Sequence, residues 1–377
     1  MSIPGPDAGG EGDPGTGLVM REEDAVKFSI YSELQHWPGK SWRQQVDETL
    51  EQIVNADTLG YDAYSVIEHY FFPKFSMSTN PFALFGKAAA RTEQIHFRTL
   101  LHPLPFYNPV GLASQVTFAD LVLDGRYEFG VGRGHGWMPP KASLPMDEES
   151  VPRYREALEL FARALTEPRL SFHGEYYQVD DVQIVPPPER KYRVFLGGTS
   201  DHTYEMAAEQ GWAVVVPPLL PYEALREQLD LYRDKCREHG NEPDIVWIHA
   251  CYIDDDRDKA HQEAQDAMRG FLAGNASPLT DYPRPDEESL HKASYGFYAS
   301  GILEGLAQTP YEKMVEDDIV WVGTPEDVIE RIEAVRDVCD GLTEVAITVN
   351  AGGISHWQSM KAQELFARRV MPHFRDG

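Results

Sequence analysis

The sequence predicts an α/β fold in which eight parallel strands, each with its following helix, close into a (β/α)8 TIM barrel. Short β-branched or aromatic runs alternate along the chain with longer segments of helical period. The alternation repeats eight times over 377 residues, and no break divides the chain into halves. A barrel of this kind often reaches such a length as one domain. A doubly wound open sheet is the alternative arrangement of the same elements.

The first half of the chain supplies four strands, each followed by a helix. The strands are expected at residues 27–31, 62–67, 95–101 and 127–131. The helices are expected at residues 41–60, 80–91, 109–121 and 152–166. The strands are recognised by β-branched and aromatic residues, and the helices by apolar residues three to four positions apart.

The second half continues the pattern after a small hairpin near residues 170–185. Strands are expected at 193–197, 212–216, 244–253 and 344–349, and helices at 200–210, 221–239, 256–273, 324–335 and 356–374. Thr324 followed by Pro325 is a typical helix start. The stretch 275–318, rich in Pro, Tyr and Ser, is expected to be irregular. It is either a lid over an active site or a surface loop with no part in the site.

Composition narrows the class of protein. Residues 1–25 are rich in Gly, Pro and acid, lack the features of a secretion signal, and are expected to form a disordered tail before one domain at 26–377. The net charge of −27 argues against nucleic-acid binding. No apolar run is long enough to span a membrane. Three scattered cysteines suggest no metal site and fit a reducing cytoplasm.

The stretch "GVGRGHG" (130–136) follows the fourth expected strand. It fails the dinucleotide-binding fingerprint, because His135 occupies the position of the third glycine. It does fall at the carboxyl end of a barrel strand, where barrel enzymes place their sites. The glycines would let a ligand approach the main chain, and Arg133 could grip a phosphate with two hydrogen bonds. A tight turn with a solvated arginine is the alternative.

A second polar turn follows the fifth strand, in "FLGGTSDHTYEMAAEQG" (195–211). Two glycines lead into Thr199, Ser200 and Thr203 at the start of a helix. The free N–H groups and dipole of a helix start favour an anion. The simpler interpretation is that Ser200 only caps the helix.

A third candidate lies in "SVIEHYFF" (65–72), where Glu68 and His69 follow the second strand. In a barrel these side chains would face the same mouth as the two turns above. A histidine there can act as a base or a hydrogen-bond donor near neutral pH. A structural histidine is the alternative.

These stretches resemble the bacterial luciferase-like family of flavin-dependent monooxygenases over roughly residues 27–373. The resemblance is carried, in family order, by "LGYDAYSVIEHYF", "NPVGLASQVTFADLVLDGRYEFGVGRGHG", "GTSDHTYEMAAEQGW", "WVGTPEDVIERI" and "LFARRVMPHF". Any one segment is weak evidence, but five in the right order are specific.

The resemblance implies a two-component monooxygenase that uses reduced FMN, supplied by a separate flavin reductase, and O2. In such enzymes a flavin C4a-hydroperoxide oxygenates a small organic substrate, by Baeyer–Villiger insertion or by hydroxylation. The resemblance also implies a homodimer. It assigns catalysis to His69 with Glu68. It assigns cofactor binding to Leu100, Leu101, Arg133, Gly134, Arg155, Thr199, Ser200 and Thr203, with a non-proline cis peptide at Leu100–Leu101 under the flavin ring.

At several positions this sequence differs from luciferase, so not every property of that enzyme is implied for this chain. Gly132, Tyr70, His135 and Gly136 differ from the luciferase residues, so light emission from a long-chain aldehyde is not expected and the substrate stays open. Two alternatives remain: a deazaflavin-dependent oxidoreductase of the same superfamily and a non-catalytic flavin-binding subunit. The small number of cations near the mouth favours FMN over the longer acidic deazaflavin tail.

Overall fold

The (β/α)8 barrel is confirmed by the computed structural model, which describes residues 26–198, 200–219 and 222–375. The tail expected at 1–25 lies outside these residues. Parallel strands follow one another around a closed ring, in which the last strand pairs with the first. In ring order they are β1 (Lys27–Ser32), β2 (Ala63–Val66), β3 (His96–Pro103), β4 (Tyr127–Gly132), β7 (Val194–Leu196), β8 (Ala213–Val216), β9 (Ile245–Ile253) and β11 (Leu342–Thr348).

The strands form because their side chains are buried on both faces. Every residue of β2, β4, β7, β8 and β9 is buried, between the barrel interior and the surrounding helices. Parallel strands covered on both sides are typically continuous apolar runs, which is the pattern of these segments. The hairpin expected near 170–185 is present as β5 (Arg169–His173) and β6 (Gln178–Gln183). A short strand that we did not expect, β10 (Trp321–Gly323), adds to β9 outside the ring.

The helices of the outer layer follow their strands as expected. They are α1 (Trp42–Thr58), α2 (Pro81–Ala89), α3 (Pro109–Val122), α5 (Ser150–Ala164), α6 (Asp201–Gln210), α7 (Tyr222–His239), α8 (Arg257–Thr280), α12 (Pro325–Val338), α13 (His356–Arg369) and α14 (Met371–Arg375). Thr324 and Asp327 form a reciprocal capping box at the start of α12, as its sequence predicts. None of the described helices is long and apolar enough to cross a membrane.

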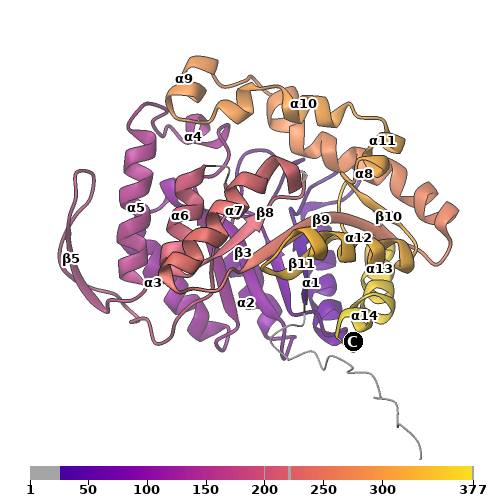
Figure 1. Cartoon of the computed structure of the whole chain (residues 1–377), viewed down its shortest axis with the longest axis horizontal. Coiled ribbons are helices and arrows are strands. Elements are labelled where there is room, and N and C mark those ends of the chain that lie inside the picture. The colour runs from indigo at the N-terminus through magenta and orange to yellow at the C-terminus, as the bar shows by residue number, and fades with distance from the viewer. Residues whose placement is uncertain (1–25, 199, 220–221, 376–377) are drawn as a thin grey trace, which may run out of the picture.

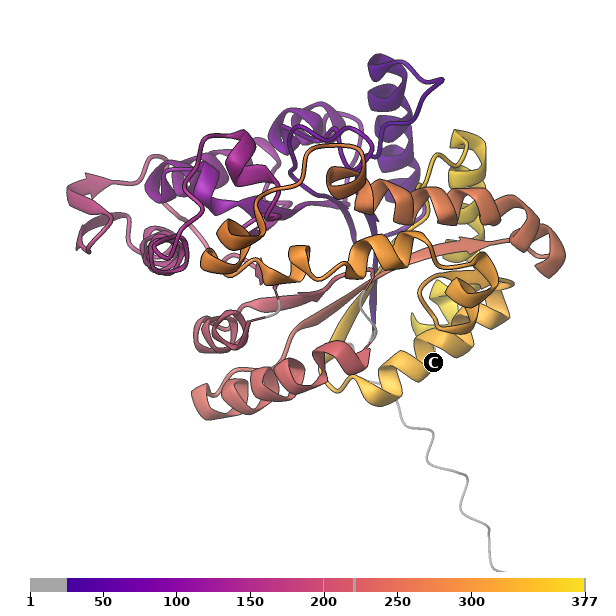
Figure 2. The same cartoon turned by 90° about the horizontal axis from the view of Figure 1, so that it is seen from above.

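The stretch 275–318 is largely helical, so the expectation of an irregular segment is wrong. Helix α8 continues to Thr280, past Pro278, and is followed by α9 (Glu287–Lys292), η3 (Gly296–Ala299), α10 (Ile302–Ala307) and α11 (Tyr311–Glu316). These pieces are too short to show a helical period in the sequence. They run along one end of the molecule (Figures 1 and 2).

Candidate functional site

A cavity of about 420 Å³ lies at the carboxyl ends of the barrel strands, beneath the insertion that contains α9, η3 and α10. Its volume is typical of a small-molecule or cofactor site. The insertion contributes lining residues, so it covers the cavity and is not a surface loop with no part in the site. The residues predicted from sequence that line it are Glu68, Leu100, Leu101, Arg133, Gly134, Arg155, Ser200 and Thr203. His69 is not among the lining residues, and Thr199 lies outside the described part of the chain.

One end of the cavity is formed by the start of α6. Ser200 is the cap residue, yet its hydroxyl makes no capping hydrogen bond to a backbone N–H. It pairs instead with the Thr203 hydroxyl at 2.9 Å. The interpretation of Ser200 as an ordinary side-chain cap is therefore wrong. Two hydroxyl groups and the positive end of the helix dipole lie together at this end, which suits an anion.

Arg155, on α5, brings a positive charge to the same end of the cavity. Within the described residues, no hydrogen bond or ion pair holds its guanidinium, although its charge acts on His202 in the first turn of α6. Burial lowers the pKa of His202, and the positive charge of Arg155 lowers it further. His202 also lines the cavity, and its buried Nε2 has no partner in the described structure. Sequence analysis missed this histidine, although it stands between Ser200 and Thr203.

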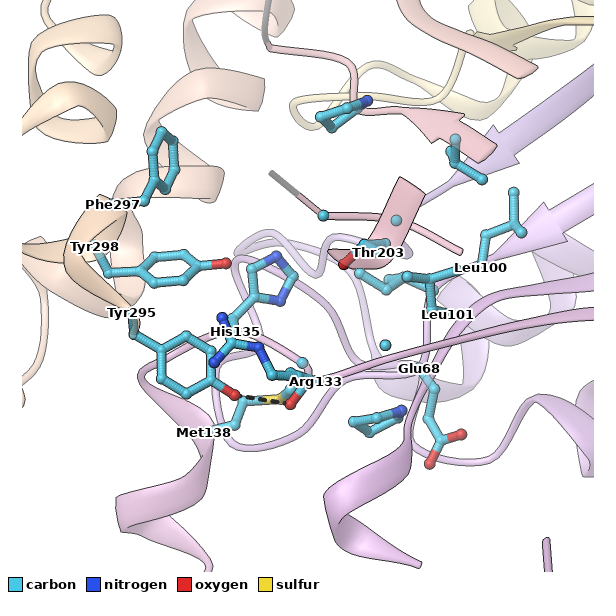
Figure 3. A pocket seen from close by; sticks show the side chains of 18 of the residues that line it. Glu68, Leu100, Leu101, Arg133, His135, Met138, Thr203, Tyr295, Phe297 and Tyr298 are labelled. Atoms are coloured by element: carbon cyan, nitrogen blue, oxygen red, sulfur yellow. Dashed lines mark hydrogen bonds between the residues drawn. The ribbon is translucent and has the colours of Figure 1, made fainter. Parts of the chain in front are cut away.

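Arg133 lines the cavity but is held by the insertion. Its Nη1 and Nη2 donate hydrogen bonds to the carbonyl oxygens of Ala293 and Ser294, both at 2.8 Å. The guanidinium stacks 4.3 Å from the centre of the Tyr295 ring, and the Tyr295 hydroxyl donates to the Arg133 carbonyl (Figure 3). The alternative of a solvated arginine in a tight turn is therefore wrong. A guanidinium has five N–H donors, so donors remain for a ligand.

The peptide bond between Leu100 and Leu101 is cis, as the family resemblance implies, and both residues line the cavity. The neighbouring glycines make room for the Leu101 side chain. A Cβ atom at Gly132 would lie 2.8 Å from Leu101 Cδ1, and one at Gly197 would lie 3.0 Å from it. The expectation that these glycines exist to let a ligand reach the main chain is thus incomplete. The group that lies so close to these glycines is the side chain of Leu101.

Glu68 is buried at the cavity wall in a hydrogen-bond network. The hydroxyls of Tyr70 and Tyr107 both donate to its Oε1, the latter at 2.5 Å, and His102 Nδ1 pairs with its Oε2. His102 also lines the cavity, and its Nε2 is 2.8 Å from the Tyr127 hydroxyl. This chain of titratable groups runs from the cavity into the barrel interior and can hold or pass a proton.

His69 lies behind the cavity wall. Its Nε2 accepts a hydrogen bond from the indole N–H of Trp137 at 2.9 Å, which leaves the ring proton on Nδ1. That buried Nδ1 has no partner among the described groups. Burial, and then the neighbouring His135, hold the pKa of His69 well below its usual value, so the ring is neutral.

An aromatic wall separates His69 from the cavity. The His135 ring stacks on Trp137, with ring centres 4.7 Å apart, and both residues line the cavity with Phe75. Tyr298 of the insertion packs edge-on against Trp137 at 4.9 Å. Burial lowers the pKa of His135 to about 4, so this wall carries no charge at neutral pH. Figure 3 shows Tyr295, Tyr298 and Phe297 on the side of the cavity opposite Leu100 and Leu101.

The polar lining residues that were not expected from the sequence include His102, His202, Glu33 and Asn275. Glu33 follows β1, and Asn275 stands near the end of α8, 242 residues away along the chain. Burial raises the pKa of Glu33 to about 8, although hydrogen bonds from Asn275 and Gln35 oppose the shift. His102, near the end of β3, and Glu33, just after β1, are polar residues at strand ends and could have been noticed in the sequence. Nothing in the sequence pairs them with their partners.

Comparison with protein families gives a match to the model described as luciferase-like monooxygenase, over residues 26–340. The alkanal monooxygenase alpha chain of Photobacterium leiognathi is 22% identical over 90% of this chain and 96% of its own length. The oxygenase component of the flavin-dependent trigonelline monooxygenase of Acinetobacter baylyi is 23% identical over 93% of this chain and 96% of its own.

Solved structures share the fold at low sequence identity. Monooxygenase RslO1 from Streptomyces bottropensis has a TM-score of 0.76, with 24% identity over 93% of this chain and all of its own. The oxygenating constituent of 3,6-diketocamphane monooxygenase of Pseudomonas putida, solved with FMN, has a TM-score of 0.71, with 20% identity over 92% and 98%. The coenzyme F420-dependent tetrahydromethanopterin reductase of Methanopyrus kandleri has a TM-score of 0.67, with 20% identity over 93% and 99%.

Proposed function

Because this chain belongs to the luciferase-like monooxygenase family, we propose that it is the oxygenase component of a two-component system. It would use reduced FMN and O2 to insert one oxygen atom into a small organic substrate. The observation that carries the proposal is that two arginines, Arg133 and Arg155, line the same cavity as the Ser200 and Thr203 hydroxyls. A relative named as the oxygenase component of a flavin-dependent monooxygenase and a structural neighbour solved with FMN support it.

The residues at this end fit the phosphate of FMN. Among the described residues, neither the hydroxyls at the start of α6 nor the guanidinium of Arg155 forms a hydrogen bond or ion pair with a charged protein group. Charge-assisted hydrogen bonds from arginine and a helix N-terminus are strong phosphate ligands. We propose that these groups and Gly134 hold the phosphate tail, and that Arg133 joins them while it also fastens the insertion.

The middle of the cavity fits a flat ring system. Leu100 and Leu101 form one side, and the stacked pair of His135 and Trp137 contributes to another. When bound there, reduced FMN would supply the electrons that activate O2. The insertion would keep water away from the reacting atoms, since Tyr298 and Phe297 close the cavity on that side.

We propose that Glu68 is the group that handles protons at the cavity wall. It touches the cavity and has His102 and two tyrosines as partners. His69 is proposed to act through its neighbours. Its hydrogen bond fixes Trp137, and its ring lies 5.4 Å from that of His135. Loss of His69 would therefore disturb the wall against which the cofactor and substrate pack.

A deazaflavin-dependent oxidoreductase is the second candidate, because a structural neighbour uses coenzyme F420. The shared fold cannot decide between the cofactors. In the described lining of the cavity, the positively charged arginine and lysine side chains are two in number, Arg133 and Arg155. Two such charges suit the single phosphate of FMN better than the longer acidic tail of a deazaflavin. A non-catalytic flavin-binding subunit is disfavoured, because binding alone would not need the buried network of Glu68, His102 and two tyrosines.

The proposal names partners as well. A flavin reductase would deliver reduced FMN by diffusion or transient contact, and two copies of this chain would form a homodimer. We propose a cytoplasmic location, since Cys236, Cys251 and Cys339 are all buried free thiols. No nucleic acid, membrane or metal is part of the proposal.

An oxygen-uptake assay tests the proposed function. The protein is mixed anaerobically with reduced FMN or reduced F420 and then exposed to O2 and a panel of ketones, aldehydes and aromatic compounds. We expect product with one added oxygen atom only with reduced FMN. Substrate reduction with F420 and no oxygenated product with FMN would instead support the second candidate.

A further inference from the structure

Glu33 stands apart from the residues assigned above. It follows β1 and lines the cavity with only 3% of its surface exposed. Its partners come from its own segment and from α8, and none belongs to the phosphate end or to the Glu68 network. A buried carboxyl group is costly in a cavity unless it is neutral or paired with a cation. No cation hydrogen-bonds or ion-pairs with Glu33 among the described residues.

Two amide groups hold Glu33 by a single oxygen. The side-chain nitrogens of Gln35 and Asn275 each donate to Oε2 at 3.0 Å. These amides are themselves fixed, because each also donates to the carbonyl oxygen of Phe271, at 3.2 and 3.0 Å. The side-chain oxygen of Gln35 accepts a hydrogen bond from the Gly352 amide at 2.8 Å. The carboxyl group is therefore held in one orientation.

This arrangement determines where the proton of a neutral Glu33 must lie. Oε2 accepts two N–H bonds and so has the role of the carbonyl oxygen. The proton is then on Oε1, which neither amide contacts. Burial raises the pKa of Glu33 to about 8, so the neutral acid is the main form at physiological pH. Glu33 thus has an O–H donor that the described hydrogen bonds leave free.

We propose that Glu33 donates a hydrogen bond to the carbonyl oxygen of the substrate, which is a ketone or aldehyde attached to a flat apolar group. The inference rests on the proposed monooxygenase function and identifies the substrate class of that site. A carbonyl oxygen is an acceptor only, so it matches the free O–H of Glu33. The aromatic wall of Phe75, Trp137 and Tyr298 suits the flat apolar part.

The same hydrogen bond favours one type of oxygen insertion. An acid that donates to a carbonyl oxygen draws electron density from the carbonyl carbon, which becomes more open to nucleophilic attack. Insertion next to a carbonyl group requires such attack, whereas hydroxylation of an aromatic ring does not. The position of Glu33 therefore points to Baeyer–Villiger chemistry over hydroxylation.

The test compares binding of acetophenone and ethylbenzene, which differ in the carbonyl oxygen. Affinities are measured by calorimetry on the protein loaded with oxidised FMN, so that no turnover is needed. We expect the wild-type protein to bind acetophenone about tenfold more tightly than ethylbenzene, the scale of one hydrogen bond. Glu33→Met should remove this preference. Glu33→Gln should keep most of it, because a glutamine amide can place its oxygen toward Gln35 and Asn275 and its N–H toward the cavity.

A second measurement covers the case in which the Met variant folds poorly. The carbonyl stretching band of bound, carbonyl-labelled acetophenone should lie at lower frequency in the wild-type protein than in Glu33→Gln, because a carboxylic acid is the stronger donor. Equal affinities for the two probes, absence of binding by either, or identical carbonyl bands in wild type and Gln variant would each overturn the proposal. Neither readout depends on reduced flavin or O2, so a failed oxygen-uptake assay would be recognised separately.

Discussion

Arg155 stands at the anion end of the cavity with no hydrogen-bond or ion-pair partner in the described structure. A ligand with a phosphate group would supply that partner. We expect Arg155→Ala to weaken FMN binding by about 1.5–3 kcal/mol, the usual contribution of a hydrogen bond to a charged group. Riboflavin, which has no phosphate, should bind equally well to the wild-type and variant proteins. Both affinities can be measured by quenching of flavin fluorescence.

Arg153 offers a matched control on the same helix. Its guanidinium lies 5.1 Å from the centre of the Tyr176 ring, and it is not a lining residue of the cavity. Arg153→Ala should leave FMN affinity unchanged. If both alanine variants weakened FMN and riboflavin alike, Arg155 would have no specific role at the phosphate.

Substitution of His69 tests whether a residue that does not line the cavity affects the reaction inside it. We expect His69→Ala to lower the oxygenation rate by on the order of 10²- to 10⁴-fold while FMN binding is retained. Trp137→Phe removes the indole donor to His69 Nε2 but keeps an aromatic ring, so it should cause a smaller loss. Single-turnover product yield and FMN affinity separate the two effects. A fully active His69→Ala variant would leave this histidine with a structural role only.

At the scale of elements, buried charges tie together strands that are distant in the chain. Glu344, on β11, is fully buried and accepts hydrogen bonds from Arg98 of β3 and from Arg193, which precedes β7, the latter at 2.8 Å. Burial alone would raise the pKa of Glu344, but the charges of Arg98 and Arg193 outweigh it and hold the pKa well below its usual value. This carboxylate joins elements across the barrel interior.

We expect Glu344→Gln to destabilise the protein by about 1.5–3 kcal/mol, because it removes the charged hydrogen-bond acceptor that Arg98 and Arg193 share, while Glu128 and Asp244 stay as their other partners. Glu330→Gln, at an exposed position on α12, should change stability by less than about 0.5 kcal/mol. Denaturant unfolding measures both. A cost for Glu344→Gln no larger than that of the control would show that the cluster adds no stability.

The same group gives a pH dependence with a definite sign. Because the folded-state pKa of Glu344 is lowered, its stabilising effect is complete above the usual carboxyl pKa of about 4 and is lost as the pH falls below it. The wild-type protein should therefore lose stability in acid more steeply than Glu344→Gln. Unfolding midpoints measured between about pH 6 and pH 3 would check this. If the unfolding midpoints of the two proteins fell equally steeply as the pH is lowered, Glu344 would not be the group responsible.

The elements also show what a single sequence can predict. The strands and long helices of the barrel follow from periodicity, because each buries enough apolar residues to show it. Strand β10 has three residues, and α9, α10 and α11 have six each, which is too short for a period to be seen. The turns after β4 and β7 could be predicted as one site, since parallel strands present their carboxyl ends at one face.

The remainder of the site depends on contacts between distant segments. Glu33 meets Asn275 only because α8 passes over the end of β1, and no local pattern records that crossing. His102 meets Glu68 through the pairing of β2 with β3. Gly130 and Gly132 were correctly identified as needing a close neighbour, but that neighbour, Leu101, is revealed only by the folded chain.

At the scale of the whole molecule, the outer face of α3 is more apolar than a solvent-facing helix needs to be. Phe118, Leu121 and Val122 are 60%, 51% and 52% exposed on this one helix. The loop that contains Val185, 65% exposed, is bound to α3 by a hydrogen bond from the Thr117 hydroxyl to the Pro186 carbonyl at 2.9 Å. Exposed apolar groups of this kind often mark an interface, and the homodimer that we propose would cover them.

Replacing Phe118 and Leu121 together by Asp should therefore convert the proposed dimer into a monomer. Two carboxylates cannot be buried against an apolar surface without a partner, so association would be opposed at this face and the barrel itself would be unaffected. Val338→Asp introduces the same charge at a 51% exposed position on α12 and should leave the dimer intact. Sedimentation equilibrium gives the mass of each variant. A wild-type protein that sediments as a monomer, or a double variant that remains a dimer, would exclude α3 as the contact surface.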